Sequence, residues 1–581
     1  MKKILLGAAA IAAIGGGLYY QQTQQSAPKI TMAQLDYVPA DTVLFASQLT
    51  PFPYEKYSNL LPTLAPNDDY KSQYEELIQA FEQSGEQNPA SAFMLSLLSK
   101  YEAAMLNKTA DKVWGLGKEF RYLAYTIGMT PVIRLELASG DNFINTLKAS
   151  ADESGLSYSE HTLHGVAYTR FALAQDSAGS IDLIASKQGQ WLTLTFNSSM
   201  FNTEEDLEIA LATKKPAVAL SSTQKLQNYV NKYDWDGSSV NYIDNTLLIS
   251  ALVADKPSRL SQMIDTFLAA AGDNTALDAI RTPGCKTDLP NIAAKFPALV
   301  FGTSKFDVTQ TYAEYDIDMV VESTDVQLLN SMGQLRGHIP AHITDNSSGM
   351  FSLGYGIDVS KISSFTNTIW QSFTQAEFQC EPLLMAQQQV KQANPMAVAM
   401  MSGMLAGVKG VSVSINDINV DLTNPDVPDV KSIDAIATLS AEDPLTLLNA
   451  GKSFNPQLAN VTIPEDGTAV SLSELLQLGD QLAFDVKIAI KGNHITVFTG
   501  NKATQTANQL QTETLQANGL LGMGMDLAPL MKLMVDAAKT TGEELPPEFE
   551  MLLEQNIKGS FNTDITDHGI QLSSSAHISK N

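Results

Sequence analysis

The chain has 581 residues, 44% of them hydrophobic and 17% charged, and its 37 basic and 63 acidic residues give a net charge of −26. The apolar content excludes general disorder, and the length favours several domains. The acidic excess excludes a nucleic-acid-binding surface, because phosphate binding requires clustered basic side chains.

The N-terminus has the layout of a bacterial export signal. Met1–Lys3 is cationic, and Ile4–Leu18 is an uncharged apolar stretch followed by a Gln-rich segment. Residues 1–30 are therefore predicted to be an export signal or a membrane anchor, and cleavage and retention stay open. The first cysteine is Cys285, which excludes a lipoprotein. We expect a periplasmic protein, anchored in the inner membrane by residues 4–20 if that segment is retained.

Two parts of the chain carry similar patterns in the same order. The strand pattern 132–137 is followed by a helical pattern at 141–147, and 433–438 is followed by one at 442–448. Hairpins are predicted at 184–196 and 486–498. A helical stretch near 204–213 matches one near 502–516, and Phe306–Thr309 matches Thr563–Thr566. Three further segments share the pattern of a strand that ends in Asp, at 240–244, 354–358 and 522–526.

This order predicts an α+β protein built from two homologous halves by internal duplication, each an antiparallel sheet covered by helices. The first half spans 31–345, with a helical insertion near 68–127. The second spans 346–581, with a Met-rich helical block near 382–408. Each Asp that ends a strand is expected to cap the following helix, because its carboxylate can accept backbone N–H groups.

Cys285 and Cys380 are the two cysteines of the chain, and in an exported protein they favour one disulfide. The bond would close a loop of roughly 96 residues. The alternative is two thiols that do not meet.

Several short patterns suggest chemistry, and each has a structural alternative. Ser222-x-x-Lys225 fits a lysine-activated serine nucleophile or a simple helix start. Asp417-x-Asn419-x-Asp421 resembles the start of a calcium loop but lacks its later Gly and Glu, so a strand is favoured. The seven histidines suggest no set of three converging ligands. We therefore expect no catalytic constellation, no cofactor and no metal.

Met396, Met400, Met401 and Met404 form a Met-rich helical stretch. Three interpretations remain open: ordinary core packing, an apolar groove for lipids or partner helices, and Cu(I) binding by thioethers.

The opening Tyr37-Val-Pro-Ala-Asp-Thr42, followed by the apolar strand 43–46, resembles a bacterial domain-of-unknown-function family of exported or membrane-anchored envelope proteins. Further similar segments are 240–244, 296–300 and 410–414. The resemblance implies a location in the cell envelope and carries no assigned activity or site residues.

Together these features predict a non-enzymatic envelope protein that binds or scaffolds an envelope component, either a protein or a lipid. A hydrolase of envelope polymer or lipid, working through Ser222 or converging carboxylates, is the first alternative. Metal handling by the methionines is the second.

Overall fold

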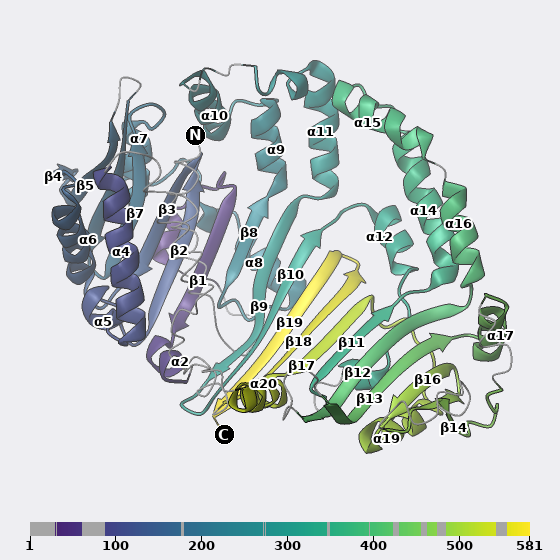
Figure 1. Ribbon diagram of the computed structural model, residues 1–581. Helices are drawn as coiled ribbons and strands as arrows, with labels where there is room; N and C mark the ends of the chain where they lie inside the picture. The colour runs from purple at the N-terminus through teal and green to yellow at the C-terminus, as the bar shows by residue number, and fades with distance from the viewer. Residues whose placement is uncertain are drawn as a thin grey trace. The chain divides into compact units, whose positions relative to one another are not determined.

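The computed structural model describes the chain with interruptions (Figure 1). The described residues are 30, 32–60, 88–175, 179–270, 272, 275–344, 349–393, 395–421, 429–454, 462–472, 484–541 and 555–580. The predicted export segment thus lies outside them, apart from residue 30. Within these ranges no helix is both long and apolar enough to cross a bilayer.

The chain divides into two compact units. The first comprises Met1–Ile317 and Phe378–Pro382, and the second comprises Asp318–Glu377 and Leu383–Asn581. Both combine antiparallel strands with helices, so the predicted α+β class is confirmed. The boundary falls within strand β10 (Tyr312–Glu322).

The other strands of the first unit are β1 (Leu44–Phe52), β2 (Phe120–Ile127), β3 (Thr130–Glu136), β4 (Tyr158–Leu163), β5 (Val166–Gln175), β6 (Ser180–Gln188), β7 (Trp191–Ser198), β8 (Val240–Asp244) and β9 (Ala298–Val308). Its helices are η1 (Ala33–Tyr37), α2 (Tyr54–Leu60), α4 (Pro89–Leu106), α5 (Ala110–Val113), α6 (Gly140–Ser154), α7 (Glu204–Ala210), η2 (Leu220–Ser222), α8 (Lys225–Tyr233), α9 (Asn245–Val253), α10 (Arg259–Ala270), η3 (Asp278–Ile280) and α11 (Pro283–Lys295).

The strands of the second unit are β11 (Phe351–Gly356), β12 (Val408–Asp421), β13 (Asp429–Ala441), β14 (Val470–Ser471), β15 (Lys487–Lys491), β16 (His494–Thr499), β17 (Leu521–Asp526), β18 (Gln555–Thr566) and β19 (Gly569–Lys580). Its helices are α12 (Val326–Gly333), α13 (Ala341–Thr344), α14 (Val359–Thr374), α15 (Glu381–Gln392), α16 (Pro395–Met404), α17 (Pro444–Phe454), α19 (Asn501–Leu510) and α20 (Leu527–Thr541). Helix α15 begins in the short segment assigned to the first unit.

Hydrogen bonding orders the strands of the two units in a similar way. In the first unit the order is β9-β8-β1-β2-β3-β7-β6-β5-β4, all antiparallel. In the second it is β19-β18-β17-β11-β12-β13-β16-β15-β14, again antiparallel. In both units the first strand in the chain pairs with the second and with a strand from much later in the chain.

Helices cover these sheets through small apolar clusters. In the first unit Phe93 of α4 and Leu147 of α6 pack with Phe171 of β5. In the second, Ala503 and Ala507 of α19 lie against the sheet residues Ile436, Ala489 and Phe498.

The helical insertion expected near 68–127 differs in extent. Residues 61–87 lie outside the described part, and 120–127 is strand β2, whose burial on both faces fits a strand better than an amphipathic helix.

The three Asp residues at strand ends cap helices, which confirms their predicted role. The side chain of Asp244 accepts from Leu247 N–H, that of Asp358 from Ser360 N–H, and that of Asp526 from Ala528 N–H. Such caps satisfy backbone donors that the first helical turn leaves without partners.

The predicted disulfide between Cys285 and Cys380 is present, and it belongs to the first unit because residues 378–382 do. Asp288 of α11 supports the same connection, since its carboxylate accepts the backbone N–H groups of Gln379 at 2.6 Å and Cys380 at 2.8 Å. Both sulfur-bearing residues are fully buried.

Candidate functional site

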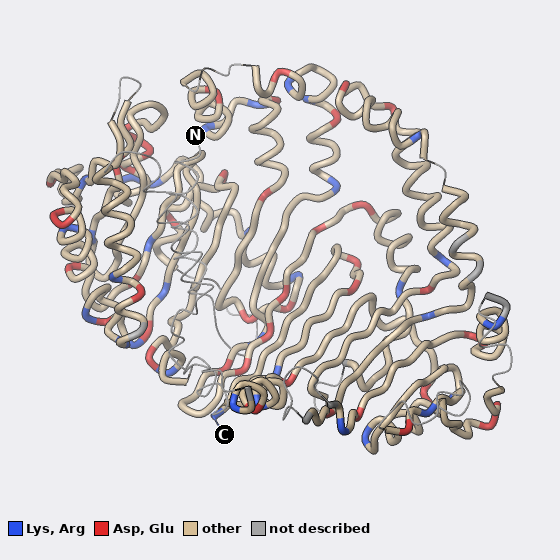
Figure 2. The backbone as a smooth tube through the Cα atoms, in the orientation of Figure 1, with Lys and Arg blue, Asp and Glu red and all other residues tan. Residues whose placement is uncertain are grey.

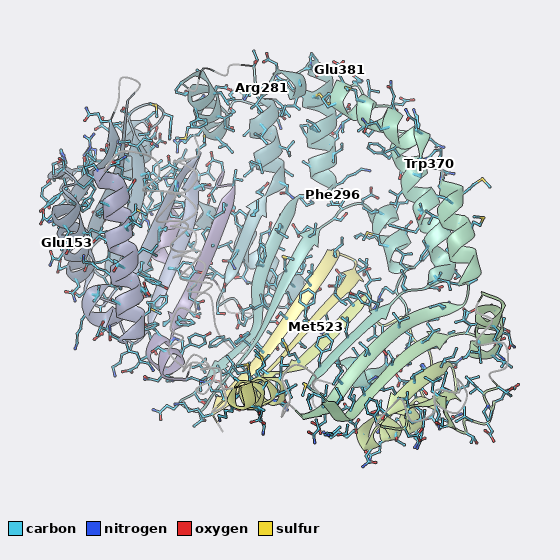
Figure 3. The ribbon with its side chains drawn as sticks, in the orientation of Figure 1. Glu153, Arg281, Phe296, Trp370, Glu381 and Met523 are labelled. Carbon is cyan, nitrogen blue, oxygen red and sulfur yellow. A yellow bond between two sulfur atoms is a disulfide. The ribbon has the colours of Figure 1, made fainter. Side chains whose placement is uncertain are left out.

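Helix α16 in the second unit presents an exposed apolar surface. Met396 is 74% exposed and Met400 is 72% exposed, and their i, i+4 spacing places them on one side of the helix. No residue from 395 to 404 carries a charge, so α16 is free of red and blue in Figure 2. Figure 3 shows sulfur atoms that project outward from this helix. Pro395 suits the first helical turn, and Ala and Met are good helix formers.

The exposed apolar residues continue along the chain from α16 into β12. Leu405 is 53% exposed, and Val411 of β12 is 43% exposed. Val411 pairs across the strands with Tyr355 of β11, which is 50% exposed. We call Met396, Met400, Leu405, Val411 and Tyr355 the apolar surface. Within this set, Met396 and Met400 share one side of α16, and Val411 and Tyr355 are cross-strand partners.

The strands that carry Tyr355 and Val411 have an unusual distribution of side chains. Their neighbours Ser352 and Ser412 are buried, as is Gly354, although these are small or polar residues. The pleat sends alternate residues to opposite faces. One face of β11 and β12 is therefore small, polar and covered, and the other carries the larger apolar side chains.

A short turn covers the small face. In the segment 338–344, which includes α13, the side chains of Ile339 and Ile343 approach so closely that a Cβ at Gly354 would lie 3.0 Å from one and 3.1 Å from the other. A Cβ at Gly522 would meet the same two residues at 3.5 Å. We call Gly354, Gly356 and Gly522 the glycine floor, because their lack of side chains makes room for this turn.

The same turn brings three histidines and one carboxylate together. The rings of His338 and His494 are 5.3 Å apart and both residues are buried, at 2% and 0% exposure. His338 Nε2 lies 3.3 Å from Glu513 Oε1, and this oxygen also accepts the N–H of Ala341 at 2.9 Å. His342, which lies in α13 beyond Pro340, has both ring nitrogens buried and without a hydrogen bond. We call His338, His342, His494 and Glu513 the histidine cluster.

The hydrogen bonds of the cluster favour neutral rings. His338 Nδ1 accepts the backbone N–H of Gln516 at 3.2 Å, so its proton resides on Nε2, facing Glu513. His494 Nδ1 is 2.9 Å from Ser440 Oγ, whereas its Nε2 is buried without a partner. A buried imidazole that leaves one nitrogen without a hydrogen bond is better accommodated neutral than charged.

Electrostatics act in the same direction. Burial, reinforced by the neighbouring imidazoles and opposed by Glu513, lowers the pKa of His342 to about 4 and that of His494 to about 4. Burial opposes ionisation of Glu513, but the adjacent His338 ring and the Ala341 N–H outweigh it and keep the Glu513 pKa below its ordinary value. Near neutral pH the rings of His342 and His494 are thus uncharged and lie near one carboxylate.

Sequence reasoning noted His338 and His342 but found no partner for them, because His494 and Glu513 come from distant parts of the chain. The exposed histidines lie elsewhere: His161 stacks on Tyr168, and His164 is 2.6 Å from Glu208. Among the described residues, no three His, Cys, Asp or Glu side chains are placed to hold one metal ion.

The Ser222-x-x-Lys225 pattern does not form a nucleophile and base. Ser222 is exposed and donates to the carbonyl of Ala219 at 2.7 Å. Lys225 Nζ instead binds Asp244 at 2.6 Å and lies 3.8 Å from the centre of the Tyr242 ring. The Lys225 ammonium is thus engaged with a carboxylate and an aromatic face, while Ser222 is engaged with a backbone carbonyl.

The remaining sequence candidates are placed as follows. Asp417, Asn419 and Asp421 lie on strand β12, paired with β13, and residues 422–428 of the suggested calcium loop are outside the described part. The side chains of Met401 and Met404 are also outside it, so the predicted groove lined by four methionines stays a prediction.

No family model and no curated protein matches this chain. Among solved structures, crystal form I of the protein TP0453 is similar over 54% of this chain and 89% of its own, at 12% identity and a TM-score of 0.21. Crystal form III of TP0453 is similar over 54% of this chain and 90% of its own, at 12% identity and a TM-score of 0.22. Values this low support no functional conclusion.

Proposed function

We propose that this protein is an exported, non-enzymatic component of the cell envelope that binds lipid through its apolar surface. The observation that carries the proposal is the exposure of Met396 and Met400 on a helix without charged residues. The flexible, polarisable Met side chain adapts to irregular apolar partners. A convex helix surface fits the acyl boundary of a membrane, where an interfacial helix buries its apolar side chains.

Export belongs to the same proposal and draws on two independent features. The cationic and apolar layout of residues 1–18 is typical of export signals. The disulfide between Cys285 and Cys380 is typical of proteins that fold outside the reducing cytoplasm. The periplasm, with or without an anchor at residues 4–20, is the location we propose, and membership of the envelope family resembled at Tyr37–Thr42 is part of it.

We also propose that the two units arose by internal duplication. The support is the shared strand order, in which β1, β2, β3, β8 and β9 take the same places as β11, β12, β13, β17 and β18. In both units a helix follows the third strand in chain order, as α6 follows β3 and α17 follows β13. A helix also follows the later hairpin, as α7 follows β6–β7 and α19 follows β15–β16. Strands β8 and β17 are followed in turn by α9 and α20.

Photolabelling tests lipid binding on the full chain. The protein is mixed with vesicles of phosphatidylethanolamine and phosphatidylglycerol that contain a diazirine-bearing acyl chain, irradiated and digested with trypsin. Cleavage after Lys391 and Lys409 releases residues 392–409, which contain α16, and cleavage after Lys532 and Lys539 releases 533–539, which contain the 42% exposed Met534 as an internal control.

We expect acyl label on 392–409 and its loss in a Met396→Ser, Met400→Ser variant, with 533–539 unlabelled in both. The matched control, Met534→Ser, removes an exposed methionine from the same unit and should leave the label on 392–409 unchanged. Absence of label on 392–409, or equal label on the control peptide, would refute lipid binding. If 392–409 instead cross-links to an envelope protein in cells, the partner is a protein and the lipid proposal is wrong.

A further inference from the structure

We propose that the histidine cluster is an acid-sensitive latch, which holds the turn 338–344 on the glycine floor while its rings are neutral and releases it when they are protonated. The geometry that carries this is the gathering of three imidazoles from two segments around one carboxylate, with His338 and His494 buried and the ring nitrogens of His342 covered. His338 and His342 come from the turn itself, and His494 comes from the first residue of β16.

Hydrogen bonds and packing hold the turn, and two of the hydrogen bonds involve side chains of the histidine cluster. His338 N–H donates to the carbonyl of Lys409 at 2.7 Å, and Ile339 N–H donates to Asn518 Oδ1 at 2.8 Å. Ala341 N–H donates to Glu513, the carboxylate beside His338. Asn518 Nδ2 also donates to the Ile339 carbonyl at 2.7 Å, Ser352 Oγ donates to the Ile343 carbonyl at 3.4 Å, and two isoleucines pack on the glycine floor. Because α13 has only four residues, its own helical hydrogen bonds cannot hold it in place.

Protonation would place positive charges where the structure offers little compensation. The rings of His338 and His494 are 5.3 Å apart, and Nε2 of His494 is buried and makes no hydrogen bond in the structure. Like charges at this distance repel strongly in a medium of low dielectric constant. Glu513 can balance one positive charge but not two or three.

The charged groups on the surrounding elements are already engaged. Lys409 of β12 lies 2.7 Å from both Asp358 and Glu442, so these two carboxylates are paired with its ammonium group. Lys491 of β15, the register partner of His494, donates to a side chain of α19. Among the residues that the structure describes, Glu513 is thus the carboxylate that faces the rings, which gives the cluster one described anion for three potential cations.

The sequence of events follows from these contacts. As the pH falls, His342 or His494 takes up a proton, and the charge is relieved most readily if the turn moves and its imidazoles reach water. His494 is fixed in the sheet by its pairing with Ser440 and Lys491, so the turn is the part that yields. The release would uncover the glycine floor on β11 and β17. Tyr355 lies on the opposite face of β11.

Hydrogen exchange measured by mass spectrometry tests the latch in the full chain. Protection of the amides in 337–344, corrected for the pH dependence of intrinsic exchange, is compared between about pH 6.5 and 4, a window that runs from the ordinary pKa of histidine to the lowered pKa of His342 and His494. We expect at least about a tenfold loss of protection in this segment, with no comparable loss in strand β2 of the first unit.

The decisive variant is His342→Gln, His494→Gln, which keeps polar side chains but cannot take up protons. We expect its protection in 337–344 to change less than about threefold over the same range. His161→Gln removes an exposed histidine from the first unit and should behave like the unmodified chain. If protection in the unmodified chain does not depend on pH, or if the double variant loses it equally, the latch is refuted.

The single variant His342→Gln covers the case in which the double variant does not fold at neutral pH. It leaves the sheet residue His494 in place and should reduce the acid-induced loss of protection by about half, on the logarithmic scale. An unchanged loss would also overturn the proposal. These outcomes are independent of lipid labelling on 392–409, so failure of the latch and failure of the proposed function are distinguishable.

Discussion

The substitution Gly354→Ala tests whether the turn 338–344 really lies on a floor that admits no side chain. The new methyl group would lie 3.0 Å from Ile339 Cγ2 and 3.1 Å from Ile343 Cγ2, both shorter than an ordinary carbon–carbon contact of 3.5–4.0 Å. Overpacking of this kind typically costs about 1–3 kcal/mol. Alanine regains about 0.5–1 kcal/mol because it is less flexible than glycine in the unfolded chain. The expected net loss is about 1–2 kcal/mol.

Urea unfolding of protein labelled with 5-fluorotryptophan measures this loss in the second unit. Of the four tryptophans, Trp370 of α14 is the one that belongs to this unit, so its fluorine resonance reports on the relevant transition. The matched control is Gly333→Ala at the end of α12, where an added Cβ meets nothing within 4 Å. It should be neutral or stabilising by up to about 1 kcal/mol.

A double-mutant cycle separates overpacking from a general effect of alanine. Ile343→Ala alone should destabilise by about 2–5 kcal/mol, because it leaves a cavity above the floor. Combined with Gly354→Ala, the added methyl group partly fills that cavity, so the two effects should couple favourably by at least about 1 kcal/mol. A neutral Gly354→Ala, or strictly additive effects, would show that the turn does not press on the sheet and would refute the reasoning.

Three further predictions concern stability. Lowering the pH from about 7 to 5 should destabilise the second unit by about 2 kcal/mol for each of His342 and His494, because an unfolded imidazole gains its proton near pH 6.5 and the buried ones gain theirs near pH 4. The stability that these rings contribute is therefore present above pH 6.5 and is lost toward pH 4. Urea midpoints at both pH values measure this loss, and a His494→Gln variant that loses as much stability as the parent contradicts it. Replacing Cys285 and Cys380 by serine should lower the stability of the first unit by about 4 kcal/mol, since the closed loop is long; calorimetry that shows an unchanged midpoint contradicts this. Gly403→Ala lies in α16 at a position where an added Cβ meets nothing within 4 Å, so it should raise the stability of the second unit by about 0.5–1 kcal/mol. The variant should also keep the acyl label on 392–409. A destabilised or unlabelled variant would show that this helix is packed differently.

Features set by neighbours in the chain were predictable. The strand ending at Asp358 and the helix after it follow from an apolar run, a capping side chain and a helical rhythm, all within about 15 residues. The disulfide was predictable for a different reason, since the chain has two cysteines and Cys285 had one possible intramolecular partner.

The histidine cluster was not predictable because its members meet only through sheet topology. Pro340 between His338 and His342 spoils the helical pattern that would have drawn attention to the pair. His494 reaches them because β16 follows β13, β12 and β11 in the sheet, an order that no local signal encodes. The alternating glycines Gly354 and Gly356 were the one usable signal, since glycine within a strand often marks a close approach of backbone or side chains.

Strand register ties the apolar surface to the glycine floor. Gly354 and Tyr355 are consecutive, so the pleat that turns the glycine toward Ile339 must turn the tyrosine the other way. A slip of one residue would drive a tyrosine into the turn and leave glycine on the apolar surface. The close fit above Gly354 therefore does more than hold α13: it excludes the shifted pairing, and the exposure of Tyr355 and Val411 follows from the same constraint. Substitutions at Tyr355 should accordingly alter the apolar surface while the turn stays protected from exchange at neutral pH.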